Sequence, residues 1–310
     1  MKTNHAIWIV CILAAFVAND CRANLFGSDN FNDNSKDPSQ WGTDFTYGGT
    51  KTFLAETNGR LEYTTIGVSA PVELCVRPWI RNFGSYTQDW EMRIDVNIPQ
   101  LPQAVRLGLF VFPGQAVNAA VSQRFDINLE NEAGVGDHWF NCRLAVNAPD
   151  TELGRTQTTS TSAALRVAFD SNTKVLSGYY DGNGPECGYT WTSLGSTIIP
   201  AGWSMTSNSV FGVAIFGFAQ SASVTSADNV FSDNFAASYR PIPKLGISLA
   251  GEDCVVTWAT NTPSYHLECT TTLTPPICWD VVTNAPGIVN TNFTVTNAVS
   301  GEARFYRLGR

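Results

Sequence analysis

The sequence predicts an all-β protein in which a two-sheet antiparallel sandwich is followed by a small β-sandwich domain. Apolar and polar residues alternate in many short runs, as they do in strands that bury one face and expose the other. Glycine, asparagine, aspartate and proline separate these runs, and no long 3.6-residue periodicity interrupts them. Charged residues are only 15% of the chain, below the quarter or so of a typical soluble protein.

The first 23 residues have the order of a secretory signal. Lys2 and His5 precede the apolar run Ala6–Val17, and a small residue, Ala23, ends the polar stretch that follows. The apolar run is about 12 residues, whereas a membrane-spanning helix needs about 20. Asp20 precedes Cys21 where a lipoprotein signal wants a small residue. We therefore expect cleavage after Ala23, no membrane span, and a secreted or cell-surface location, with release and surface attachment both left open.

The charge balance excludes one class of partner. The chain has 19 Lys and Arg residues against 27 Asp and Glu residues, for a net charge of −8, and no run of basic residues. A nucleic acid backbone requires a basic surface. We therefore expect no nucleic acid partner, and the sequence leaves the oligomeric state unknown.

Six cysteines follow the signal, and an exported chain permits disulfides. They are Cys75, Cys142, Cys187, Cys254, Cys269 and Cys278. Three precede residue 240 and three follow it, so the connectivity is not deducible from the sequence. Cys269 and Cys278 flank a turn that contains two prolines and form the first pair to test. A zinc site is disfavoured because the chain has no Cys-x-x-Cys motif.

Residues 24–240 form the first predicted domain. Its clearest strands are Trp90–Ile98, Arg124–Glu130, Asp137–Val146 and Leu165–Phe169. Its clearest turns are Asn131–Gly136, Asp170–Thr173 and Asp181–Gly184. Pro241 and Pro243 then stiffen a break in the pattern. The second predicted domain, 241–310, contains about six strand-like runs, including Cys254–Trp258, Tyr265–Cys269, Phe293–Thr296 and Ala303–Leu308.

The tryptophans divide by their surroundings. Trp90, Trp191, Trp258 and Trp279 lie in or beside apolar strand patterns, which favours core packing. Trp41 and Trp203 lie near glycine and serine in segments that resemble loops, which favours the rim of the sandwich. His138 is expected in the core at the start of a strand.

The first domain resembles the concanavalin A-like lectin/glucanase superfamily in its laminin-G-like form. The likeness covers roughly residues 24–238. It is carried by the opening Ser28–Ser35 with Trp41 and Gly59–Tyr63, by the hairpin from Leu165 through Val175–Asp181 to Trp191, and by the closing Val230–Phe235. The second domain resembles a small immunoglobulin- or fibronectin-like module in Trp258, Leu267–Leu273, Trp279 and Arg304–Leu308.

The resemblance implies a jelly roll whose face or rim loops hold carbohydrate. Superfamily members often carry a structural calcium ion where the first and last strands meet, and Asp29 and Asp233 stand at the matching positions. Carboxylate oxygens suit calcium, although both residues could equally hydrogen-bond their own turns. Glucanases of the superfamily carry Glu-x-Asp-x-Glu on one strand, whereas this chain has Asp126, Asn128 and Glu130. The missing middle carboxylate and the shortened first one disfavour hydrolysis.

The same strand offers a candidate binding face. Strand parity places seven residues of the hairpin on its polar side: Arg124, Asp126, Asn128, Glu130, Trp139, Asn141 and Arg143. A symmetric turn would set Asn128 opposite Trp139 and Asp126 opposite Asn141. An indole face packs on a pyranose ring, while carboxylate, amide and guanidinium groups meet its hydroxyls. The competing interpretation is an ordinary outer sheet face laced by ion pairs, with Trp139 covered.

These observations predict a non-catalytic, lectin-like protein that binds an extracellular or cell-surface glycan. The alternatives are a structural or adhesive surface protein without sugar binding and, less favoured, a degenerate glycoside hydrolase. The sequence does not identify which glycan would be bound.

Overall fold

The computed structural model describes residues 25–48, 51–67, 72–118, 122–133, 136–147, 149–184, 189–220, 223–239, 245–260, 265–274, 278–298 and 303–309. The predicted signal at residues 1–23 and Cys187 lie outside these ranges. The chain divides into two compact units after Arg240. Among the described residues, no helix has the length and apolar character to cross a membrane.

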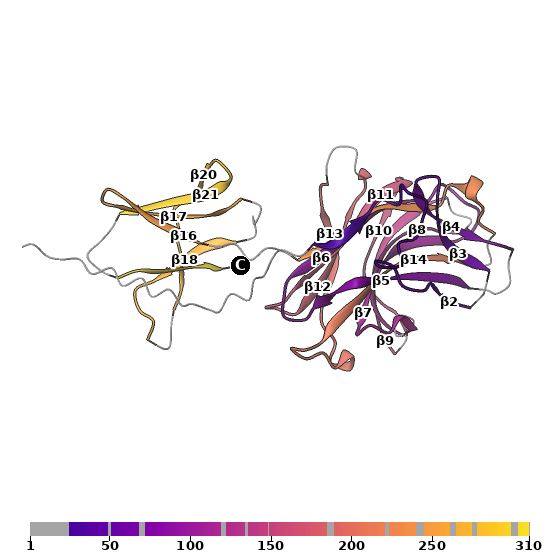
Figure 1. Ribbon diagram of the computed structural model, residues 1–310, viewed down its shortest axis with the longest axis horizontal. Coiled ribbons are helices and arrows are strands. Elements are labelled where there is room, and N and C mark those ends of the chain that lie inside the picture. The colour runs from indigo at the N-terminus through magenta and orange to yellow at the C-terminus, as the bar shows by residue number, and fades with distance from the viewer. Residues whose placement is uncertain are drawn as a thin grey trace, which may run out of the picture. The chain divides into compact units, whose positions relative to one another are not determined.

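The first unit is a sandwich of two large antiparallel sheets, which confirms the predicted fold class (Figure 1). The first sheet runs in the order β13 (Thr192–Ile198), β12 (Val175–Asp181), β11 (Ser162–Asp170), β6 (Trp90–Asn97), β15 (Phe231–Tyr239), β4 (Arg60–Thr65) and β3 (Thr52–Thr57), and β1 (Leu25–Asp29) also pairs with β15. The second sheet runs in the order β10 (Thr151–Thr158), β9 (His138–Val146), β8 (Gln123–Asn131), β7 (Val105–Pro113), β14 (Val210–Ala219), β5 (Glu73–Ser85) and β2 (Phe45–Tyr47).

The two sheets are closed by strands from opposite ends of the unit. β15 pairs with β4 and β6, and β14 pairs with β5 and β7, so late strands lie among early ones. Figure 1 shows this as orange strands between indigo and purple ones. Each sheet contains one late strand at an inner position, β14 in the second sheet and β15 in the first. Neither sheet can therefore form completely until the chain beyond residue 210 has been synthesised.

The inner faces of the two sheets share one aromatic core. The largest fully buried side chains are Trp41, Trp79, Trp90, Tyr63, Phe31, Phe112, Phe125, Phe140, Phe169, Phe211 and Phe235. Most of them belong to one cluster between the sheets. Trp41 and Trp203 are 1% and 4% exposed, so the expectation that they lie at the rim is wrong. Trp41 packs edge-on against Trp79 at 4.8 Å, and a loop that follows β1 carries it into the core.

The second unit is a smaller pair of sheets. One sheet contains β16 (Gly246–Ala250), β17 (Asp253–Ala259), β21 (Asn292–Ala298) and β20 (Gly287–Val289), and the other contains β19 (Asp280–Val281), β18 (His266–Thr270) and β22 (Phe305–Gly309). Among its described residues, the buried apolar cluster consists of Val256, Trp258, Leu267 and Val295. Trp279, expected in the core, is only half-buried and lies under the Arg307 guanidinium. The immunoglobulin- or fibronectin-like identity of this unit stays a prediction.

The expected disulfide is not present. Cys75, Cys142, Cys254, Cys269 and Cys278 form no disulfide within the described part of the chain, so Cys269 and Cys278 are not paired. Cys75 and Cys142 lie in the apolar core, where burial raises the pKa of the Cys75 thiol to about 12. A thiol in such surroundings packs as a small apolar side chain.

One buried cation, Arg77 on β5 of the second sheet, binds residues on β3 of the first sheet. Arg77 on β5 is 3% exposed. Its guanidinium pairs with Glu56 Oε1 at 2.8 Å and with Asp44 Oδ2 at 3.0 Å, and it also donates to the Leu54 carbonyl. Burial raises the pKa of Glu56 to about 6, although the charge of Arg77 opposes this rise.

Glu56 should therefore give the stability of the protein a measurable dependence on pH. Its folded pKa is above the ordinary value of 4.5, so between these pH values the folded state binds more protons than the unfolded state. The free energy of unfolding should fall as pH rises through this window and level off above about pH 7. We expect Glu56→Gln to remove this slope, measured as the wild type minus variant difference in urea unfolding from pH 4.5 to 7.5. A difference that stays constant or rises with pH would contradict the assignment.

Candidate functional site

The outer face of the second sheet carries the predicted polar residues. All seven belong to β8 and β9, which form the expected hairpin. The inner positions between them, including Phe125, Ile127 and Leu129, are fully buried in the core. Strand alternation therefore leaves the seven predicted residues on the opposite side.

The register of this hairpin differs from the prediction by two residues. Asn128 lies opposite Asn141, Asp126 opposite Arg143, and Glu130 opposite Trp139. The turn is shifted because Asn131, expected in the turn, instead pairs with His138 as part of β8. The Asn131 amide donates to the carbonyls of Leu101 and Gln103 at 2.8 and 2.6 Å, which holds the strand extended. An even shift keeps every residue on its predicted face.

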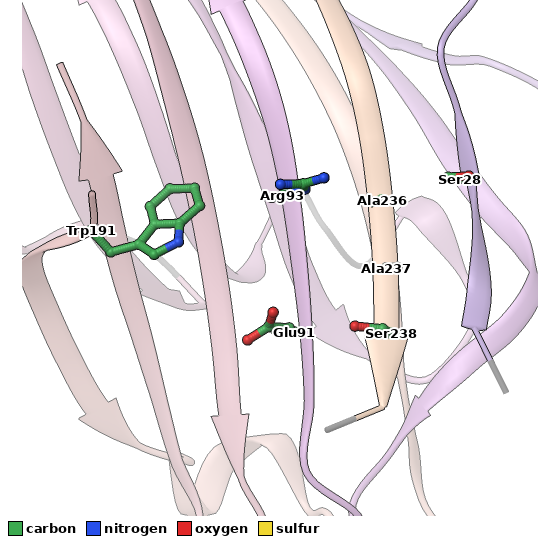
Figure 2. A pocket seen from close by; sticks show the side chains of 7 residues that line it. All are labelled: Ser28, Glu91, Arg93, Trp191, Ala236, Ala237 and Ser238. Carbon is green, nitrogen blue, oxygen red and sulfur yellow. The ribbon is translucent and has the colours of Figure 1, made fainter. Parts of the chain in front are cut away.

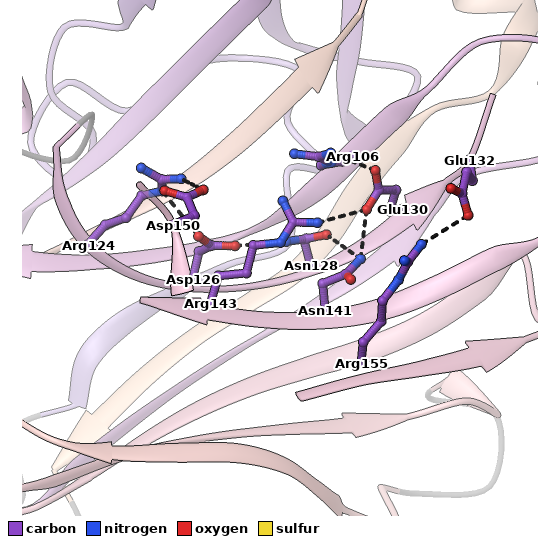
Figure 3. A network of polar contacts seen from close by, with 10 residues as sticks. All are labelled: Arg106, Arg124, Asp126, Asn128, Glu130, Glu132, Asn141, Arg143, Asp150 and Arg155. Carbon is purple, nitrogen blue, oxygen red and sulfur yellow. Dashed lines mark hydrogen bonds and ion pairs between the residues drawn. The ribbon is translucent and has the colours of Figure 1, made fainter. Parts of the chain in front are cut away.

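The polar residues form one connected network (Figure 3). Arg124 donates to Asp126 Oδ2 at 3.1 Å and to Asp150 Oδ2 at 2.5 Å. Asn128 donates to Asp126 Oδ1 at 2.8 Å. Glu130 accepts from Arg143 at 2.9 Å and Asn141 at 2.8 Å through Oε2, and it pairs with Arg106 at 2.7 Å through Oε1.

This network is more buried than an ordinary solvated strand face. Asp126, Asn128, Glu130 and Asn141 are at most 5% exposed. Burial raises the pKa of Asp126, and the charges of Arg124 and Arg143 oppose that rise. Two buried atoms, Arg106 Nε and Asn141 Oδ1, have no hydrogen-bond partner among the described residues. Buried polar atoms without a partner are energetically costly.

A pocket of about 390 Å³ opens beside the network. Its polar lining includes the predicted residues Arg124, Asp126, Asn128 and Arg143. Its other lining residues were not predicted, and they include Arg106, Asp150, Tyr47, Phe110, Phe216 and Phe218. The alternating outward positions Arg106, Gly108 and Phe110 could have identified β7 as a third strand of the site. Tyr47 and Phe218 come from β2 and β14, and no local pattern links those strands to the hairpin.

Trp139 does not line this pocket. It is half-buried, and the Arg155 guanidinium of β10 lies 4.0 Å from the centre of its ring. Arg155 also pairs with Glu132 at 2.9 Å. The expectation that Trp139 is the open aromatic platform of the site is therefore wrong, because a neighbouring strand covers its face with a cation.

The predicted calcium residues lie close together but do not fit a calcium site. Asp29 accepts from the Phe31 N–H at 2.8 Å and from Trp41 Nε1 at 2.7 Å, so protein donors engage both of its oxygens. Asp233 Oδ1 accepts from the Asn234 N–H at 2.7 Å. Among the described residues, no group of three or more Asp, Glu, His or Cys side chains comes together.

Comparison with family models and with curated proteins finds no match. Similar solved structures include the CBM2 module of the evolved Dit protein of Lactobacillus casei BL23 phage J-1, at 11% identity over 69% of this chain and 94% of that chain, with a TM-score of 0.47. They also include a GH43 protein, BlXynB of Bacillus licheniformis, at 13% identity over 68% of this chain but only 37% of that chain, with a TM-score of 0.43. A third is the Emp46p carbohydrate recognition domain, at 11% identity over 68% of this chain and 94% of that chain, with a TM-score of 0.45.

The structure predicts a large difference in stability cost between two glutamates of the β8–β9 hairpin, Glu130 and Glu132. Glu130→Ala would leave two arginine side chains facing each other at a buried position, which should cost about 2–4 kcal/mol of unfolding free energy. Glu132→Ala removes an exposed pair with Arg155, with 41% of the glutamate side chain accessible, and should cost less than about 1 kcal/mol. Urea denaturation of both variants tests this, and equal costs would contradict the structural role of Glu130.

Proposed function

We propose that the first unit binds a saccharide, without catalysis, in the pocket on the outer face of the second sheet. The observation that carries this proposal is the meeting of an aromatic wall and a fixed polar network in one pocket of about 390 Å³. Sugars present an apolar C–H face and a rim of hydroxyls, and they need both kinds of surface.

The aromatic wall is supplied by four side chains. Phe110 and Phe216, which are only 4% and 3% exposed, stack with ring centres 3.9 Å apart. Phe218 lies beside them with the Arg106 guanidinium 4.7 Å from its ring centre. Tyr47 is 52% exposed and offers the most accessible ring. A pyranose ring seated here would pack against Tyr47 and Phe218.

The polar wall is organised before a ligand arrives. Three arginines, Arg106, Arg124 and Arg143, are held by three carboxylates, Asp126, Glu130 and Asp150. The arginine side chains keep 24%, 14% and 15% of their surface accessible. Such fixed donors bind hydroxyls with a small loss of side-chain entropy, and their balanced charges suit a neutral glycan.

The same contacts argue against hydrolysis at this site. Both oxygens of Asp126 accept bonds from Arg124 and Asn128, and both oxygens of Glu130 accept bonds from Arg106, Arg143 and Asn141. A nucleophile and a proton donor need carboxyl oxygens directed at the substrate. These two carboxylates instead position arginine side chains.

The predicted secretory signal would expose this pocket to extracellular or cell-surface glycans, as the sequence resemblance to the concanavalin A-like superfamily suggests. A structural or adhesive role without sugar binding is the second candidate. This role is favoured because the carboxylates and arginines of the network already bind one another.

The proposal is tested by a glycan array with the mature protein and two matched variants. Tyr47→Ala removes the most accessible ring of the pocket, and we expect about a tenfold loss of affinity. Phe53→Ala removes a ring that is 41% exposed on β3 of the other sheet and should leave binding unchanged. Silence of the folded wild type across the array, or equal effects of the two substitutions, would overturn the proposal in favour of the structural role.

A further inference from the structure

We propose that two copies of this chain associate through strand β16 of the second unit, so that their four-stranded sheets join into one continuous antiparallel sheet. The surface is the free edge of β16 (Gly246–Ala250), and its occupant is the same strand of a second copy. The association does not depend on the saccharide pocket of the first unit. It would present two copies of the first unit from one particle.

Strand β16 has one edge that is free to accept another strand. It stands at the end of its sheet and, within the described part of the chain, it pairs only with β17. All of its residues are exposed. The free edge of such a strand presents a row of backbone N–H and C=O groups, to which a further strand can bind.

The side chains of β16 are apolar and face the core side of the sheet. Ile247 and Leu249 are 55% and 59% exposed. Ile247 lies opposite the fully buried Val256, and Leu249 lies opposite Cys254, which packs against the same apolar cluster. Opposite residues of an antiparallel pair share a face. Ile247 and Leu249 therefore extend the apolar inner face of the sheet beyond the part that the second unit buries.

The other edge strands of the described chain are protected from such pairing. β10 and β13 lie against each other, so closely that a Cβ atom at Gly154 would collide with the Leu194 carbonyl. β1, β3 and β22 contain the charged residues Asp29, Glu56 and Arg307. β2, β19 and β20 have only two or three residues each. Cover, charge and shortness are devices that prevent edge pairing, whereas β16 is longer, uncharged and apolar.

The tryptophan on the outer face of the first sheet, in contrast, is engaged by its own unit. It belongs to a pocket of about 410 Å³ whose lining includes Trp191, Glu91 and Arg93 (Figure 2). The Tyr189 ring stacks on the Trp191 indole with centres 5.1 Å apart, and the Arg166 guanidinium lies 5.4 Å from the indole centre. Trp191 is half-buried, so the expectation that it belongs to the core is wrong.

The sequence of β16 is complementary to itself in an antiparallel pair. When the strand pairs with its copy about Ser248, Ile247 lies opposite Leu249 of the second copy, and Leu249 lies opposite Ile247 of the second copy. The small residues Gly246 and Ala250 then also lie opposite each other. Both apolar pairs fall on the core side of the joined sheet. A two-fold axis at Ser248 generates this arrangement, as in the symmetric dimers that most homo-oligomers form.

The size of the contact determines how tight the dimer should be. Pairing adds the backbone hydrogen bonds of a five-residue strand and covers two apolar side chains from each copy. This contact is smaller than a standard stable interface of about 1,600 Å². We therefore expect a reversible dimer with a dissociation constant of about 1–100 μM, whose population rises with protein concentration.

The first test is sedimentation equilibrium of the mature protein over a concentration series. The double variant Ile247→Lys, Leu249→Lys places like charges opposite each other across the pair and should raise the dimer dissociation constant by about tenfold or more. The matched control is Ile288→Lys, Val289→Lys. These side chains are 67% and 57% exposed on β20, at the other edge of the same sheet, and their replacement should leave the dissociation constant unchanged. Thermal unfolding verifies that each variant is folded.

The second test examines the register. Position 248 faces itself across the two-fold axis, so Ser248→Cys should give a disulfide-linked dimer on mild oxidation, in excess of wild type on non-reducing gels. Ala250→Cys is the control, because its two copies would lie about 13 Å apart, too far for a disulfide.

Three outcomes would overturn the proposal. The first is a wild type that stays monomeric up to about 0.1 mM, which would leave the edge of β16 to a strand of another protein. The second is an equal effect of the two double variants, or none from the β16 pair. The third is equal cross-linking at positions 248 and 250. None of these measurements involves a glycan, so their failure is separate from failure of the saccharide pocket.

Discussion

The apolar layer shared by the two large sheets is the constraint on which the rest of the first unit depends. Each strand contributes alternate residues to that layer, so its remaining residues must face outward. The inner positions of β8 fill the core with Phe125, Ile127 and Leu129, and this fixes Asp126, Asn128 and Glu130 on the outer face. The packing of the core thus decides which residues lie on each outer face.

Strand parity could be predicted from the sequence, and strand register could not. The alternation in Arg124–Glu130 predicts the correct face because a side-chain period of two survives any even shift. The register depends on Asn131, whose amide bonds to carbonyls of the segment before β7. That contact is not visible in the hairpin sequence, which is why a symmetric turn predicted the wrong cross-strand pairs while placing all seven residues on the right side.

The tryptophans show where local pattern fails. Trp41 sits among loop residues, yet it is buried because the loop after β1 folds back onto Trp79 and Phe235. Trp191 follows an apolar pattern, yet it lies on an outer face because its segment crosses β11 and β6. Trp139 is covered by Arg155 from the adjacent strand. In each case burial is decided by a strand or loop that is distant in sequence, and strand order in a sandwich is a non-local property.

The two outer faces solve the same physical problem in different ways. A charged sheet surface must hold its polar groups in place without letting them collapse onto one another. On the second sheet, arginines and carboxylates alternate across β7, β8 and β9 and fix each other by ion pairs. On the first sheet, Arg93 and Arg166 lie over aromatic rings, and Arg166 also pairs with Glu91. Ion pairs weaken in salt when they are exposed, whereas stacking on rings depends less on ionic strength. The ionic network is sheltered from this effect by burial, because the carboxylates of Asp126 and Glu130 that hold its arginines are only 2% and 5% exposed.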